Sequence, residues 1–124
     1  MNRTTMTRTV AARGWGAGTA VLGAAMLIGP RAVAGLVSSG ASSPSPVIVQ
    51  VLGARQLLQG AAVMARPGRR LLLTGGSVVD VLHAGSMLAA ARWWPRYRQP
   101  ALTSAAVAAG SAVVGGLISR RWGP

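Results

Sequence analysis

Long apolar runs alternate with short polar segments along the chain. The principal runs and one shorter run after Pro30-Arg31 cover residues 15–29, 32–37, 47–65, 71–91 and 101–119. The last three are each close to the roughly 20 residues that a helix needs to cross a ~30 Å hydrocarbon core. Proline ends or kinks a helix, so the first span is expected to cover 15–29 or 15–37. The pattern predicts an all-α fold, a four-helix transmembrane bundle.

The polar segments define the layout around these runs. They cover residues 1–14, 38–46, 66–70, 92–100 and 120–124. The segment 38–46 reads SSGASSPSP and is expected to be a flexible loop, whereas 66–70 reads RPGRR and is expected to be a tight basic turn. We therefore predict a basic N-terminal segment over 1–14, a single transmembrane domain over 15–119, and a basic tail over 120–124.

The first apolar run has two interpretations. Its basic start and the sequence AVA at 32–34 resemble a secretory signal, whose cleavage would leave a chain beginning at Gly35 and three helices. Trp15 at the start of the run, and the small-residue spacing Gly14-x-x-x-Gly18, are instead typical of a helix that stays in the membrane and packs there. We favour the retained helix and keep cleavage as the alternative.

Composition supports a small membrane protein. The chain has 124 residues, of which 51% are hydrophobic, and its mean hydropathy is +0.44. A water-soluble domain of this size would expose too much apolar surface. The chain has no cysteine, which excludes disulfides, thiolate chemistry and cysteine-type zinc sites.

The net charge of +12 raises nucleic acid as a partner, but the distribution of the charge argues against it. The arginines flank the apolar runs and do not form one stripe. Aromatic side chains also lie at the ends of the runs, as an interfacial belt requires: Trp15, Trp93, Trp94, Tyr97 and Trp122. The expected partner is a lipid bilayer with anionic headgroups, and no nucleic acid.

The arginine distribution also predicts the orientation. In a four-helix layout, segments 1–14, 66–70 and 120–124 lie on one side and carry eight arginines, against three or four on the other side. Basic residues concentrate on the cytoplasmic side of a membrane. We therefore expect a multi-pass protein of the plasma membrane with both termini in the cytoplasm.

The ionisable residues inside the apolar runs are the candidate functional residues. Asp80, the only acidic side chain, lies in the middle of the run 71–91, and His83 follows it three residues later on the same face of a helix. A charge at such a depth costs about 2.5–3.5 kcal/mol on insertion scales. Arg55 lies equally far from the turn 66–70, about 15 Å away along an antiparallel helix. We predict a buried Arg55–Asp80 pair.

The predicted cluster has a structural and a functional interpretation. Gln59 and His83 are expected to fill the remaining hydrogen-bond positions, which gives an intramembrane polar cluster of Arg55, Gln59, Asp80 and His83. In the favoured interpretation the cluster docks the second and third spans, within a non-enzymatic protein of accessory or assembly type. In the alternative, Asp80 and His83 serve a small proton-linked transporter or channel. One acid and one histidine make only a short proton relay, and the sequence has no second acidic side chain to receive a proton from Asp80.

Other chemistry is disfavoured by the spacing. Ser77, Asp80, His83 and Ser86 follow one helix face, where the two-sided contact of a Ser–His–Asp triad is rarely achieved. Asp80 and His83 supply two metal ligands where a closed site takes about four. We therefore assign no catalytic, cofactor-binding or metal residues, expect no cofactor, and expect a membrane-protein partner or a homo-oligomer.

Two short elements carry a family resemblance. Residues 53–60 read GARQLLQG, residues 79–87 read VDVLHAGSM, and Gly29-Pro30 breaks the first span. These elements resemble those of small actinobacterial multi-span membrane proteins of unknown function, in which a Gly-x-Arg-x-Leu-x-Gln-Gly-like element precedes an acidic one. Gln56 stands where many members carry an acid. The resemblance implies the four-helix layout and the importance of Arg55 and Asp80, and it implies no activity.

Overall fold

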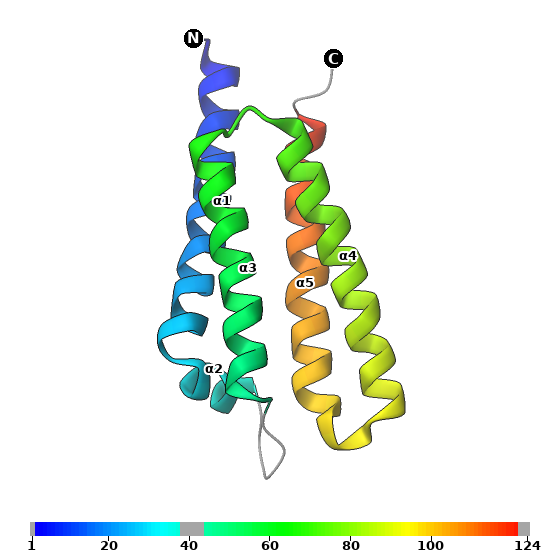
Figure 1. The fold of residues 1–124 in the computed structure, drawn as a ribbon. Helices are drawn as coiled ribbons and strands as arrows, with labels where there is room; N and C mark the ends of the chain where they lie inside the picture. Colours follow the sequence, from blue (N-terminus) through cyan, green and yellow to red (C-terminus); the bar gives the residue numbers. More distant parts are fainter. Residues whose placement is uncertain (1, 38–43, 122–124) are drawn as a thin grey trace.

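The fold is an all-α bundle, as the hydropathy pattern predicts. A computed structural model describes residues 2–37 and 44–121. Its helices are α1 (Arg3–Ile28), α2 (Pro30–Val37), α3 (Pro46–Ala65), α4 (Arg70–Trp93) and α5 (Arg98–Arg120), with a short 3₁₀ turn, η1 (Pro95–Tyr97), before α5 (Figure 1). Most of the predicted loop 38–46, together with Trp122 and the end of the predicted tail, lies outside the described residues.

The helices make this a multi-pass membrane protein. Among the described residues, three stretches are each long and apolar enough to cross a membrane: α3, α4, and η1 together with α5. The fourth crossing is α1 with α2, if this bent pair counts as one span. The axis turns by 109° at the break, so Pro30 starts a new helix and the first span does not run straight to residue 37. The predicted break at Pro30 is confirmed.

The first helix begins earlier than the apolar run. Residues 3–14, which belong to the basic N-terminal segment predicted over 1–14, are helical and continuous with the rest of α1. Asn2 caps this helix, because its side-chain oxygen accepts a hydrogen bond from the Thr5 backbone N–H at 2.9 Å. Threonine and arginine are tolerated along a helix whose start lies beyond the hydrocarbon, so hydropathy alone does not show this extension.

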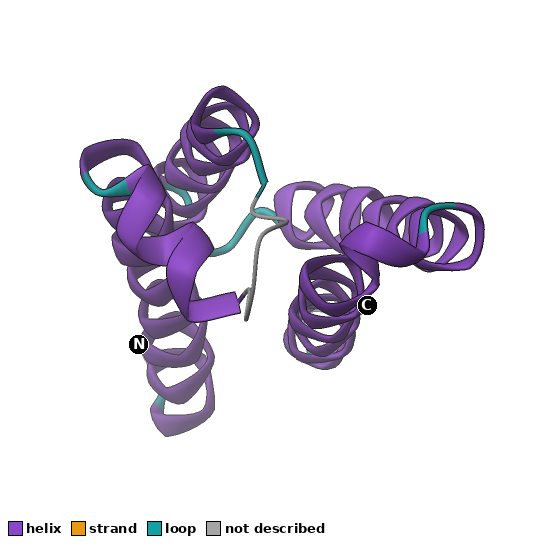
Figure 2. Cartoon of the chain, turned by 90° about the horizontal axis from the view of Figure 1, so that it is seen from below, coloured by secondary structure: helices purple, strands orange, loops and turns teal. Residues whose placement is uncertain are grey.

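The helices form two antiparallel pairs, α1 with α3 and α4 with α5 (Figures 1 and 2). The start of α1, the end of α5 and the α3–α4 turn lie at one end of the bundle, which we call the turn end. The elements α2 and η1 lie at the other end. The sequence predicts α3 and α4 as antiparallel neighbours. They are joined by the turn, but they pack less closely than the helices within each pair.

Four glycines bring the backbones of α1 and α3 together. Gly16 faces Gly60, and Gly23 faces Gly53, two turns further along both helices. A Cβ placed on Gly16 would lie 2.8 Å from the Gly60 carbonyl oxygen, and one on Gly53 would lie 2.8 Å from the Gly23 carbonyl oxygen. Small residues at such crossings allow the close packing that associates helices in lipid.

The glycines expected to pack the first span are the wrong ones. Cβ atoms placed on Gly14 or Gly18 would meet nothing within 4 Å. Residues 14 and 18 lie one turn apart on a face that points away from α3, whereas Gly16 and Gly23 face it. The spacing of Gly14 and Gly18 therefore does not support the retained-helix interpretation. The glycines of α1 that pack against α3 are Gly16 and Gly23.

Small side chains fill the interior, and large ones cover the outside. The buried apolar residues are mostly alanines, while many leucines, valines and isoleucines are exposed, as suits a surface in contact with lipid. One compact apolar cluster forms at the turn end, where Ala12, Val63 and Leu73 are buried. Trp15 packs against it, whereas Trp93 is 70% exposed at the opposite end of α4.

Candidate functional site

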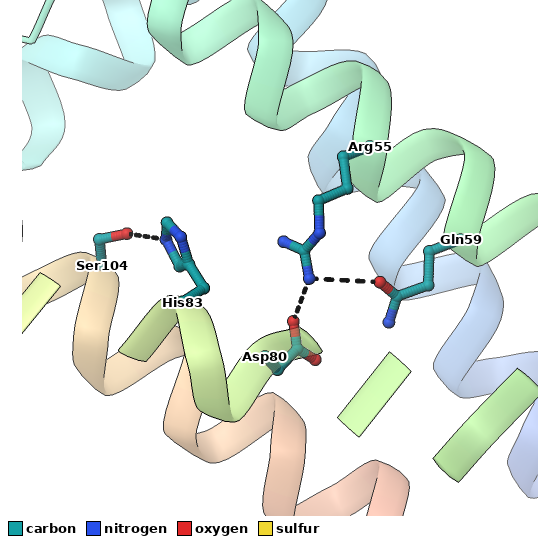
Figure 3. A network of polar contacts seen from close by, with 5 residues as sticks. All are labelled: Arg55, Gln59, Asp80, His83 and Ser104. Atoms are coloured by element: carbon teal, nitrogen blue, oxygen red, sulfur yellow. Dashed lines mark hydrogen bonds and ion pairs between the residues drawn. The ribbon is translucent and has the colours of Figure 1, made fainter. Parts of the chain in front are cut away.

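Asp80 is buried in the middle of α4 and pairs with Arg55 of α3. Its carboxylate oxygen Oδ1 accepts a hydrogen bond from Arg55 Nη2 at 2.7 Å (Figure 3). The residue is 1% exposed, whereas the Arg55 side chain is 26% exposed. The ion pair that the matched depths predict is therefore present, and it neutralises both charges within the apolar part of the bundle.

Gln59 supports the pair from the next turn of α3. Its side-chain oxygen lies 3.5 Å from Arg55 Nη2, a long and therefore weak hydrogen bond. The side chain extends over α4 at Gly76, where an added Cβ would lie 2.6 Å from Gln59 Nε2. Gly76 therefore makes room for a polar side chain, and any substitution there would displace Gln59.

His83 does not join the Arg55–Asp80 pair, contrary to the prediction. Its ring nitrogen Nε2 lies 2.8 Å from the hydroxyl oxygen of Ser104 on α5 (Figure 3). Residues three apart are offset by about 60° around a helix, so Asp80 can face α3 while His83 faces α5. His83 thus links the two helices of one pair, and Asp80 links the two pairs.

Ser104 is the polar partner that sequence reasoning missed. The neighbouring Thr103 bonds back to its own helix, donating to the Gln99 carbonyl oxygen at 3.0 Å. The depth argument that pairs Arg55 with Asp80 does not find this contact. His83 lies about 15 Å from the end of α4 and Ser104 about 9 Å from the start of α5, so distance along the helices does not match them.

Arg55 also borders two open spaces. The first, which we call the interhelix groove, has a volume of about 410 Å³ and is lined by α3 and α4 residues that include Gln59 and Gly76. The second, the inner cavity, has a volume of about 150 Å³ and reaches His83, Ser104 and the α2 end of the bundle. The groove extends toward the turn end, so the two spaces approach Arg55 from opposite directions.

The arrangement does not form a hydrolytic triad. Asp80 contacts Arg55, and His83 contacts Ser104, so the carboxylate and the imidazole have separate partners. Ser86 donates to the Leu82 carbonyl oxygen at 2.9 Å, and Ser77 Oγ is buried with no hydrogen-bond partner among the described residues. Residues 2–37 and 44–121 contain no group of three histidine, cysteine or acidic residues that could hold a metal ion.

Comparison with protein-family models, with curated proteins and with solved structures finds no match. The resemblance carried by residues 53–60 and 79–87 therefore stays a prediction. Functional conclusions about the chain depend on the geometry of its own residues.

Proposed function

We propose that this chain is a non-enzymatic integral membrane protein of accessory or assembly type, in the plasma membrane with both termini in the cytoplasm. Its Arg55–Asp80 pair docks α3 on α4 and so determines how the two helix pairs meet. One observation carries the proposal: the only acidic side chain of the protein is 1% exposed and is engaged by an arginine of the other helix pair.

The remaining polar groups support a structural role for the cluster. Gln59 adds a second acceptor for Arg55, and His83 is engaged by Ser104. A proton pathway needs successive groups that exchange protons, and the chain has no second acidic side chain to take a proton from Asp80. Large apolar side chains on the outside of the bundle offer a surface to lipid and to the helices of a partner or a second copy.

The orientation rests on the arginines. The start of α1, the α3–α4 turn and the end of α5 lie together at the turn end, so their arginines face one side of the membrane (Figure 1). The opposite end carries Arg31 and the arginines at 92, 96 and 98. The larger number at the turn end supports its assignment to the cytoplasm.

A small proton-linked transporter or channel is the second candidate, and one observation favours it. The interhelix groove and the inner cavity approach Arg55 from opposite directions. In this candidate, Asp80 would be released from Arg55 when it binds a proton, and His83 would exchange protons with the inner cavity. The bond between Arg55 and Asp80 would then break in each cycle.

A flux measurement separates the two candidates. The double variant Arg55→Leu/Asp80→Leu removes both charges together, so neither is left unpaired. Wild type and variant are reconstituted in vesicles under an imposed pH gradient, and a pH-sensitive dye inside reports proton entry. The proposal expects both proteins to match protein-free vesicles, and both to retain the same stoichiometric partner or second copy in mild detergent. A flux that wild type carries and the folded double variant loses would replace the proposal with the transporter.

A further inference from the structure

Three arginines surround a pocket where the start of α1 approaches the end of α5. The pocket has a volume of about 320 Å³ and is lined by Arg3, Thr4, Thr7, Arg8 and Arg121. We call it the arginine pocket. It lies at the turn end of the bundle, where the chain enters α1 and leaves α5 (Figure 1). It is separate from the Arg55–Asp80 pair, which lies midway along the helices.

Among the described residues, no acidic side chain lines the arginine pocket. Asp80 is the only acidic side chain in the sequence, and Arg55 engages it. Within the described residues, Arg3, Arg8 and Arg121 take part in no ion pair. Guanidinium groups gathered around one space repel one another, and an anion between them removes that repulsion. The electrostatics of the pocket therefore favour an anionic ligand.

We propose that the arginine pocket binds a phosphate group, supplied by the headgroup of an anionic phospholipid or by free phosphate. Guanidinium groups bind phosphate oxygens through paired, charge-assisted hydrogen bonds. Thr4 also lines the pocket and carries a hydroxyl donor, whereas the Thr7 hydroxyl already donates to the Arg3 carbonyl oxygen at 2.9 Å. The pocket opens at the start of α1, where the helix dipole also favours negative charge.

The position of the pocket fits a lipid phosphate. It lies at the end of membrane-crossing helices, which is the level of the lipid headgroups, and on the side that the arginine distribution assigns to the cytoplasm. The cytoplasmic leaflet is the one rich in anionic lipids. A bound phosphate would join α1 to α5, two helices of different pairs that otherwise contact each other little.

The test uses two triple variants of the full chain that remove the same charge. The pocket variant, Arg3→Gln/Arg8→Gln/Arg121→Gln, removes the three guanidinium groups that line the arginine pocket. Its matched control, Arg66→Gln/Arg69→Gln/Arg70→Gln, changes three exposed arginines of the turn at the same end of the bundle, outside the pocket. Binding of phosphatidylglycerol to each purified protein in neutral detergent is titrated, with diacylglycerol, which lacks the phosphate, as the control lipid.

The proposal expects phosphatidylglycerol to bind wild type and the turn variant within about twofold of each other, and the pocket variant at least about tenfold more weakly. Both sources of phosphate are consistent with this result, and competition with inorganic phosphate distinguishes them. If inorganic phosphate displaces the lipid, the pocket is a free-phosphate site. If it does not displace the lipid, the pocket is a headgroup site. An equal loss in the two triple variants, or equal binding of diacylglycerol, would overturn the proposal. If the pocket variant unfolds, the single variant Arg8→Gln takes its place, with an expected loss of about threefold.

Discussion

Substituting Gly23 by alanine tests the contact between α1 and α3 directly. A Cβ at this position would lie 2.5 Å from the Gly53 carbonyl oxygen and 2.9 Å from Leu57 Cα. Ordinary contact begins at 3.4 Å, so the two helices must separate locally by about 1 Å. Both neighbours are backbone atoms, which cannot move aside by changing a rotamer. The added methyl group must therefore displace a helix.

The expected cost follows from this displacement. Overpacking of a close contact typically costs about 1–3 kcal/mol. Alanine favours a helix over glycine by at most about 1 kcal/mol, which offsets part of that cost. We therefore expect Gly23→Ala to lower the free energy of unfolding by up to about 2 kcal/mol relative to wild type, and by about 1–3 kcal/mol relative to a glycine-to-alanine change that meets no neighbour. Gly60→Ala acts on the same pair of helices, so the double variant should lose less than the sum, because one separation relieves both contacts.

The assay is unfolding in mixed detergent micelles, followed by the circular dichroism of the helices. Gly18→Ala is the matched control, since it adds the same methyl group to the same helix at a position where nothing lies within 4 Å. We expect this control to be as stable as wild type or more stable by up to about 1 kcal/mol. Equal stability of Gly23→Ala and Gly18→Ala would refute the packing that the structure shows.

Three further predictions concern other parts of the bundle. Ser77→Ala removes a buried hydroxyl that has no partner among the described residues, so thermal unfolding should show unchanged or higher stability, and a loss above about 1 kcal/mol would contradict this. His83→Leu leaves Ser104 unpaired and should cost about 1–3 kcal/mol, whereas His83→Gln keeps a hydrogen-bonding group and should cost less than about 1 kcal/mol. In the otherwise cysteine-free chain, a membrane-impermeant maleimide applied to intact cells should label Arg96→Cys and not Gly68→Cys, and the reverse result would invert the proposed orientation.

The sequence predicts the fold class and the ion pair for clear physical reasons. A helix in lipid must satisfy its own backbone, so a long apolar run predicts both a helix and its approximate position. The constant rise of a helix turns distance from a turn into depth, which is why Arg55 and Asp80 could be paired without coordinates. Both inferences use quantities that do not depend on how the helices pack.

The sequence did not predict which glycines join α1 to α3 or which helix His83 contacts, because both depend on how the helices pack. Seventeen glycines offer many small-residue spacings, and hydropathy does not say which face of α1 meets α3. In the structure, Gly16 and Gly23 are the glycines of α1 that face α3. Their separation of two turns recurs in Gly53 and Gly60, and this matched spacing is the sequence pattern that could have identified the contact. The direction of His83 also depends on packing, because a rotation of α4 decides whether its side chain meets α3 or α5.

The central claim is that Arg55 and Asp80 neutralise each other and thereby dock the two helix pairs. A double-mutant cycle measures this most directly, through the free energies of unfolding in detergent of Arg55→Leu, Asp80→Leu and the double variant. Each single variant leaves a charge unpaired in the bundle and should lose about 3–5 kcal/mol, while the double variant should return to within about 1 kcal/mol of wild type. A double variant as unstable as the worse single variant would contradict the claim.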